Sequence, residues 1–164
     1  MNEFVVMGVS GCGKSTVAGM LASRTGGIFL DADDFHPPEN KAKMAAAIPL
    51  TDDDRWGWLD ALNRKLRSLA AGERTVFLAC SALKQAYRDR LRDSLPSLGF
   101  IYLRGTKELI CGRLRSRENH FMSPALLDSQ FATLEEPEDA ITVSIDKPAS
   151  DLVEEILPLI GRAE

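Results

Sequence analysis

Residues 8–15 are the feature that most constrains this 164-residue chain. They read GVSGCGKS and match the pattern G-x-x-x-x-G-K-[ST], with a short apolar run before them and a helix-forming stretch after them. Glycines let the backbone curl so that successive N–H groups point at phosphate oxygens, and the helix that follows adds the positive end of its dipole. The pattern therefore predicts a strand, a phosphate-binding loop and a helix, in that order.

Within this loop, Lys14 is predicted to bridge the β- and γ-phosphates of ATP, and Ser15 to bind Mg²⁺ through its hydroxyl. The residues expected to contact the nucleotide here are Gly8, Val9, Ser10, Gly11, Cys12, Gly13, Lys14, Ser15 and Thr16. A switch GTPase would need D-x-x-G followed by N-K-x-D. The nearest matches, residues 54–57 and 40–43, come in the reverse order, and the second ends in Lys, which disfavours that class.

Short β-branched or aromatic runs alternate with helical stretches along the whole chain. Strands are expected at residues 4–8, 28–30, 75–80, 100–103 and 141–145. Helices are expected at residues 14–24, 38–47, 53–71, 84–94, 106–116, 124–135 and 150–162. This alternation predicts a three-layer α/β fold in which helices flank a parallel five-stranded sheet, and the length predicts a single domain over residues 1–164.

Composition excludes several classes of function. The chain has 20 Lys+Arg against 24 Asp+Glu, a net charge of −4, which disfavours nucleic acid as a partner. No uncharged stretch approaches the roughly 18 residues of a membrane span, and residues 1–7 lack a basic leader. The three cysteines have no C-x-x-C spacing, so neither a disulfide framework nor a zinc site is supported. We expect a cytoplasmic protein without a membrane partner.

An acidic pair ends the second expected strand, in the run LDADD at residues 30–34. Alternation along a strand would place Asp31 and Asp33 on one side, at the edge of the sheet where α/β folds bind ligands. Two carboxylates beside a phosphate-binding loop suit a small-molecule kinase. Asp31 is then expected to hold Mg²⁺ through its water shell, and Asp33 to accept the proton of the attacking hydroxyl. A solvated acidic turn is the alternative.

Longer motifs strengthen this interpretation. Residues 31–37 read DADDFHP, residues 49–55 read PLTDDDR, and residues 79–84 read ACSALK. Further matches are Asn40, residues 43–44, 58–59 and 87–89, Arg113, Arg117, and residues 120–122, 129–131 and 134–137. In these segments the chain resembles the gluconokinases, a family of small P-loop kinases. It departs from the family pattern at Ala47, Gly57, Asn119 and residues 138–140.

The resemblance implies ATP- and Mg²⁺-dependent phosphorylation of D-gluconate to 6-phospho-D-gluconate, a reaction that feeds the pentose phosphate and Entner–Doudoroff routes. It also implies a homodimer, a substrate region at about residues 33–60 and a lid at about residues 113–124. A kinase acting on another small hydroxy acid, such as shikimate, is one alternative. A nucleotide-sensing module without turnover is another.

Two sets of side chains complete the expected site. Arg113 and Arg117 lie one helical turn apart and are expected to contact the ATP phosphates, with Arg117 also stabilising the transferred group. Their alternative is a solvated basic helix face. The residues expected to contact the substrate are Asp33, His36, Arg55, Ser81, Lys84, Arg88 and His120. The alternatives are a helix cap for His36, an ordinary loop residue for His120, a local ion pair for Arg55 and a surface charge for Arg88.

Overall fold

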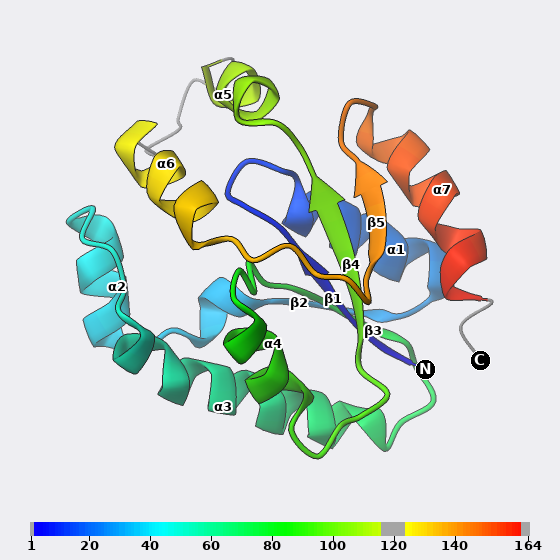
Figure 1. Ribbon diagram of the computed structural model, residues 1–164. Coiled ribbons are helices and arrows are strands. Elements are labelled where there is room, and N and C mark those ends of the chain that lie inside the picture. The colour runs from blue at the N-terminus through cyan, green and yellow to red at the C-terminus, as the bar shows by residue number, and fades with distance from the viewer. Residues whose placement is uncertain (1, 116–123, 162–164) are drawn as a thin grey trace.

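A computed structural model describes residues 2–115 and 124–161 (Figure 1). Its centre is a five-stranded sheet made of β1 (Glu3–Met7), β2 (Ile28–Asp31), β3 (Val76–Ala79), β4 (Gly99–Arg104) and β5 (Ile141–Ser144). The strand order is β2-β3-β1-β4-β5, and every neighbouring pair is parallel. This confirms the predicted parallel five-stranded sheet, and it places the carboxyl ends of all five strands at one edge.

Alternate residues of each strand enter two different hydrophobic cores. In β1, Phe4 and Val6 belong to one core, whereas Val5 and Met7 belong to the other. The first core lies under α1 (Lys14–Thr25) and α7 (Ala149–Ile160), and the second lies under α3 (Asp52–Ala70) and α4 (Gln85–Arg92). Because both faces of the strands are buried, β1 and β3 are apolar almost throughout, as central parallel strands are.

The remaining helices stand near the carboxyl edge of the sheet (Figure 1). They are the 3₁₀ helix η1 (Ala32–Phe35), α2 (Pro38–Ala45), α5 (Lys107–Arg115) and α6 (Pro124–Thr133). Ile110 of α5 and Leu127 of α6 enter the same core as α1 and α7. No helix in the described ranges is both long and apolar enough to cross a membrane.

Helix α2 ends two residues before its predicted end because the chain turns into a Schellman motif. The N–H of Ile48 donates to the carbonyl of Lys43, and the N–H of Ala47 donates to that of Met44. This geometry puts Ala47 in the left-handed region with a φ of 57°. Glycine adopts this backbone region without strain, whereas alanine does not.

Candidate active site

The phosphate-binding loop connects β1 to α1, as the motif predicts. Gly8, Gly11 and Gly13 adopt φ values of 146°, 84° and 93°. A Cβ atom on Gly8 would lie 2.7 Å from the Sγ of Cys12 and 2.8 Å from the carbonyl oxygen of Leu103, so a side chain cannot fit there without a shift. Helix α1 begins after Gly13 with no side-chain cap. Its first N–H groups therefore remain available to an anion.

Asp31 joins the start of α1 to the segment that follows β2. One of its carboxylate oxygens accepts from the Ser15 hydroxyl at 3.1 Å, and the other accepts from the N–H of Asp33 at 3.0 Å. Lys14 folds back over the loop, where its Nζ donates to the carbonyl of Val9 at 3.1 Å. A hydroxyl and a carboxylate in contact beside a phosphate-binding loop are the donor types that Mg²⁺ takes together with substrate phosphates.

Asp33 comes close to Asp31, but not by the route that strand alternation suggested. Strand β2 ends at Asp31, which caps η1 with its side chain, and Asp33 is the second residue of that helix. The pKa of the Asp33 carboxyl is raised, mainly by desolvation and also by the negative charge of Asp31, while Lys14 acts in the opposite direction. A carboxylate with a raised pKa is better suited to accept a proton than an ordinary one.

His36 is buried against α3. Its ring stacks on Trp58 with a centroid distance of 4.0 Å, and its Nδ1 lies 3.2 Å from the side-chain nitrogen of Asn40, which can donate to it. Burial, with help from the charges of Arg55 and Lys41, lowers the pKa of His36 to about 4. The helix-cap alternative does not hold, because α2 begins without a side-chain cap. His36 is therefore neutral at pH 7.

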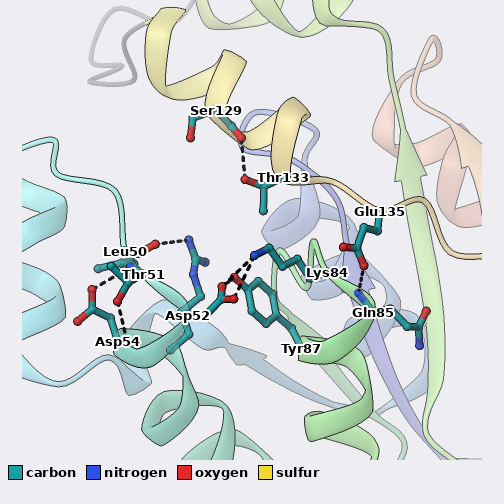
Figure 2. A network of polar contacts seen from close by, with 11 residues as sticks. Leu50, Thr51, Asp52, Asp54, Lys84, Gln85, Tyr87, Ser129, Thr133 and Glu135 are labelled. Carbon is teal, nitrogen blue, oxygen red and sulfur yellow. Dashed lines mark hydrogen bonds and ion pairs between the residues drawn. The ribbon is translucent and has the colours of Figure 1, made fainter.

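Four polar side chains form a group that we call the acceptor cluster: Asp52 and Arg55 in the first turn of α3, Lys84 just before α4, and Tyr87 in α4. The Nζ of Lys84 lies 3.0 and 3.1 Å from the two carboxylate oxygens of Asp52, and the hydroxyl of Tyr87 donates to the same carboxylate (Figure 2). The guanidinium of Arg55 lies 5.2 Å from the centre of the Tyr87 ring. The cluster brings together two of the predicted substrate residues, Arg55 and Lys84.

Arg88 is not the surface charge that was the alternative for it. Its side chain is 1% exposed and donates to the carbonyls of Ala82, Leu83 and Glu135 and to the side chain of Gln85. Burial lowers its pKa, while the charge of Glu135 opposes this. These contacts tie α4 to the chain after β3 and after α6. The guanidinium is thus engaged mainly by oxygens of this chain, and its buried Nε has no partner within the described residues.

The other predicted residues have mixed outcomes. The carbonyl of Ser81 accepts from the N–H of Gly8 at 3.3 Å, so Ser81 lies against the phosphate-binding loop. The guanidinium of Arg113 donates to the carbonyls of Ile145 and Lys147 beyond β5. Arg117 and His120 lie outside the described residues, as do residues 116–123 of the expected lid.

Gln130 of α6 lies in a recognised motif, but the sequence did not indicate its role. Its side-chain oxygen accepts from the N–H of Ser10 at 2.7 Å, and its side-chain nitrogen donates to the Ser10 hydroxyl at 3.0 Å. Asp52 and Tyr87 also lay in recognised motifs without an assigned role. Gln130, Asp52 and Tyr87 bind partners that are 32 to 120 positions away in the sequence, so the sequence alone could not show these contacts. Their presence in recognised motifs was the one signal that they matter.

Comparison with known proteins agrees with this geometry. A family profile described as an AAA domain matches residues 4–137. The parallel sheet, the phosphate-binding loop and the carboxylates beside it define a P-loop kinase. Thermoresistant gluconokinase of Escherichia coli (strain K12) is 42% identical, over 98% of this chain and 94% of the relative. The chain belongs to the gluconokinase family.

Solved structures support the same assignment. A gluconokinase from Sinorhizobium meliloti 1021 matches with a TM-score of 0.89 and 43% identity, over 98% of this chain and 92% of that one. A shikimate kinase from Aquifex aeolicus matches with a TM-score of 0.61 at 17% identity, over 98% of both chains. The second likeness shows a shared fold alone. The sequence identity therefore favours the gluconokinases over the shikimate kinases.

Proposed function

We propose that this protein transfers the γ-phosphoryl group of ATP to the terminal hydroxyl of D-gluconate, giving 6-phospho-D-gluconate and ADP. The observation that carries this proposal is the juxtaposition, at one edge of the sheet, of a phosphate-binding loop with Asp33. High identity over nearly the whole chain to gluconokinases selects the acceptor. The single domain spans residues 1–164, with its substrate region at about residues 33–60 and its lid at about residues 113–124.

In the proposed reaction, Asp33 accepts the proton of the attacking hydroxyl. The oxygen of that hydroxyl forms a bond to the γ-phosphorus, while the bond from this phosphorus to the β–γ bridging oxygen breaks and ADP leaves. Residues 8–16 cradle the phosphates, and Lys14, Arg113 and Arg117 balance their charge. Ser15 and Asp31 fit Mg²⁺, which when bound neutralises charge on the β- and γ-phosphates.

Arg55 is the proposed anchor for the gluconate carboxylate. Its Nη2 donates to the carbonyl of Leu50 at 3.3 Å, while its buried Nε has no partner within the described residues. A planar guanidinium with unused donors is suited to a carboxylate. Neutral His36, Ser81, Lys84 and His120 supply further polar groups for the hydroxyls and the carboxylate. Arg88, through its contacts with surrounding carbonyls, positions this pocket.

One assay tests the proposal: ADP release from ATP with a panel of gluconate, related aldonates and shikimate. The expected result is rapid release with gluconate, slower release with other aldonates, and little with shikimate. Release that does not depend on any acid, or no release with any of them, would contradict the proposal. Turnover with shikimate alone would assign the other hydroxy-acid kinase activity, and nucleotide binding without turnover would indicate a sensing module.

A homodimer and a cytoplasmic location belong to the same proposal. The family resemblance supports the dimer, and light scattering of the purified chain measures it. All three cysteines are free, Cys12 and Cys80 being buried, which suits a reducing compartment. A monomeric mass at working concentration would remove the dimer from the proposal without affecting the reaction.

A further inference from the structure

The acceptor cluster contains a carboxylate of its own, which competes for one of the two cations. Asp52 contacts Lys84 through both carboxylate oxygens and also accepts from Tyr87. Its side chain is 47% exposed and that of Lys84 is 32% exposed, so the pair sits at the rim of the site rather than in the core. Figure 2 shows these three side chains converging between α3 and α4.

The charges of the cluster leave one cation uncompensated. Arg55 and Lys84 bring two positive charges and Asp52 brings one negative charge, which is a net single positive charge. The hydrogen bonds from Tyr87 and Lys84 lower the pKa of Asp52, so this carboxylate is ionised at pH 7. The neighbouring Lys43 and Asp54 form their own ion pair at 2.7 Å and add no net charge.

The uncompensated cation is Arg55. Within the described residues it forms no ion pair shorter than 4.0 Å, and the positive charge of Lys84 is matched by Asp52 instead. Both cations lie near the ring of Tyr87, whose centre is 5.2 Å from the Arg55 guanidinium and 5.6 Å from the Lys84 ammonium. An acceptor with one carboxylate would therefore balance the charge of these four side chains.

We infer that Asp52 is a specificity-determining residue, which neutralises Lys84 and so restricts the acceptor pocket to sugar acids with a single negative charge. This inference rests on the proposed function, because it assumes that the acceptor carboxylate binds at Arg55. A dianionic group in the same place would leave one charge unmatched and would be repelled by Asp52. Specificity of this kind comes from a repulsive element as well as an attractive one.

The test compares three acceptors that share one carbon chain and a free terminal hydroxyl: D-gluconate, neutral D-glucitol and dianionic D-glucitol 1-phosphate. The readout is kcat/KM for each, measured in the wild type and in Asp52→Asn, which keeps the shape of the side chain and removes its charge. Relative to gluconate, we expect the dianion to improve by about tenfold or more in Asp52→Asn, because close like-charge repulsion is removed.

Two further variants test whether the change in acceptor preference comes from the charge of Asp52 itself. Asp53→Asn removes the same charge one residue away, where the side chain is exposed, and should change the ratio by less than about twofold, as an exposed charge outside the cluster does. Lys84→Met removes a cation and should shift preference the other way, from gluconate toward glucitol. Thermal unfolding of each variant verifies that it is folded.

Failure of the inference and failure of the proposed function give different results. If wild type turns over gluconate and the ratio stays unchanged in Asp52→Asn, the inference is overturned while the proposed function stands. An equal shift in Asp53→Asn also overturns it, because the effect would then be a general one of net charge. Wild type without any turnover of gluconate overturns the proposed function, and the inference with it.

Discussion

The phosphate-binding loop follows β1, whereas the acceptor cluster comes from segments after β2 and β3, and the two are held in different ways. The loop is made of main chain, with three glycines at positive φ and a buried strand on one side. The acceptor cluster is made of side chains from α3, from α4 and from Lys84 just before α4, held by an ion pair, a hydrogen bond from a phenol and cation–π contacts. A contiguous segment can encode the first, whereas the second requires two helices to be brought together.

Because of this difference, the nucleotide half of the site (the loop) and the acceptor half (the cluster) respond to different kinds of substitution. Among ordinary substitutions only proline removes a main-chain N–H, so the nucleotide half is best changed through the side chains that support the loop. The acceptor half depends on individual side chains, and each can be removed alone. Substitutions in the two halves should therefore separate the KM for ATP from the KM for gluconate.

Asp33→Asn should have the largest effect, because Asp33 is the proposed base for the attacking hydroxyl. We expect kcat to fall by about 10²–10⁴, as is typical for loss of a general base, with the KM for ATP nearly kept. In the wild type, kcat/KM should fall as the pH drops through the raised pKa of Asp33. Steady-state kinetics with Asp34→Asn as the matched control checks this, and near-normal turnover in Asp33→Asn would remove Asp33 from the role.

Arg55→Ala should break only the acceptor half. Loss of charge-assisted hydrogen bonds worth about 1.5–3 kcal/mol predicts a KM for gluconate raised by about 10- to 100-fold. The KM for ATP should stay within about twofold, since Arg55 belongs to the other half. Arg64→Ala, an exposed position on the same helix, is the control. Equal changes in both KM values would show that the two halves are not separable in this way.

Gln130→Ala should change only the nucleotide half. The loop loses two hydrogen bonds at Ser10, each worth about 0.5–1.5 kcal/mol, so the KM for ATP should rise by about tenfold. The KM for gluconate is expected to change little. Ser129→Ala, at an exposed neighbouring position on α6, is the control. An unchanged KM for ATP would mean that the loop keeps its shape without Gln130.

His36 should make the acceptor half sensitive to acid. Its pKa is about 4 in the folded protein against an ordinary value of 6.5, so between these values the unfolded chain takes up a proton that the native protein does not. The contribution of His36 to native stability is therefore fully present above pH 6.5 and is lost progressively as the pH drops toward 4. Urea unfolding across this range should show a steeper loss in the wild type than in His36→Gln. Parallel curves would contradict the lowered pKa.

Ala47→Gly should have the smallest effect. Glycine relieves the left-handed strain at the end of α2, so the free energy of unfolding should rise by about 0.5–1 kcal/mol. The matched control is Ala46→Gly, because Ala46 has a φ of −87° and gains nothing from glycine. Urea midpoints measure both. Stabilisation by Ala46→Gly but not by Ala47→Gly would contradict the Schellman geometry as the cause.

Much of the fold was predictable because its signals are local. The five strands, the parallel sheet and the phosphate-binding loop all follow from short runs of apolar residues, glycines and caps. The early end of α2 at Ala45 and the 3₁₀ helix after Asp31 were missed, since each depends on a few turn-specific hydrogen bonds. Asp31 and Asp33 come together through a capping contact rather than through strand alternation.

The sequence by itself determined the phosphate-binding loop, the class of fold and the family, because each of these depends on contiguous motifs. Only the tertiary structure decided what the charged side chains do. It buried Arg88 among carbonyls, made His36 neutral against Trp58, paired Lys84 with Asp52 and brought Gln130 to Ser10. The physical reason is that burial, charge pairing and pKa depend on partners distant in the chain, which a motif does not specify.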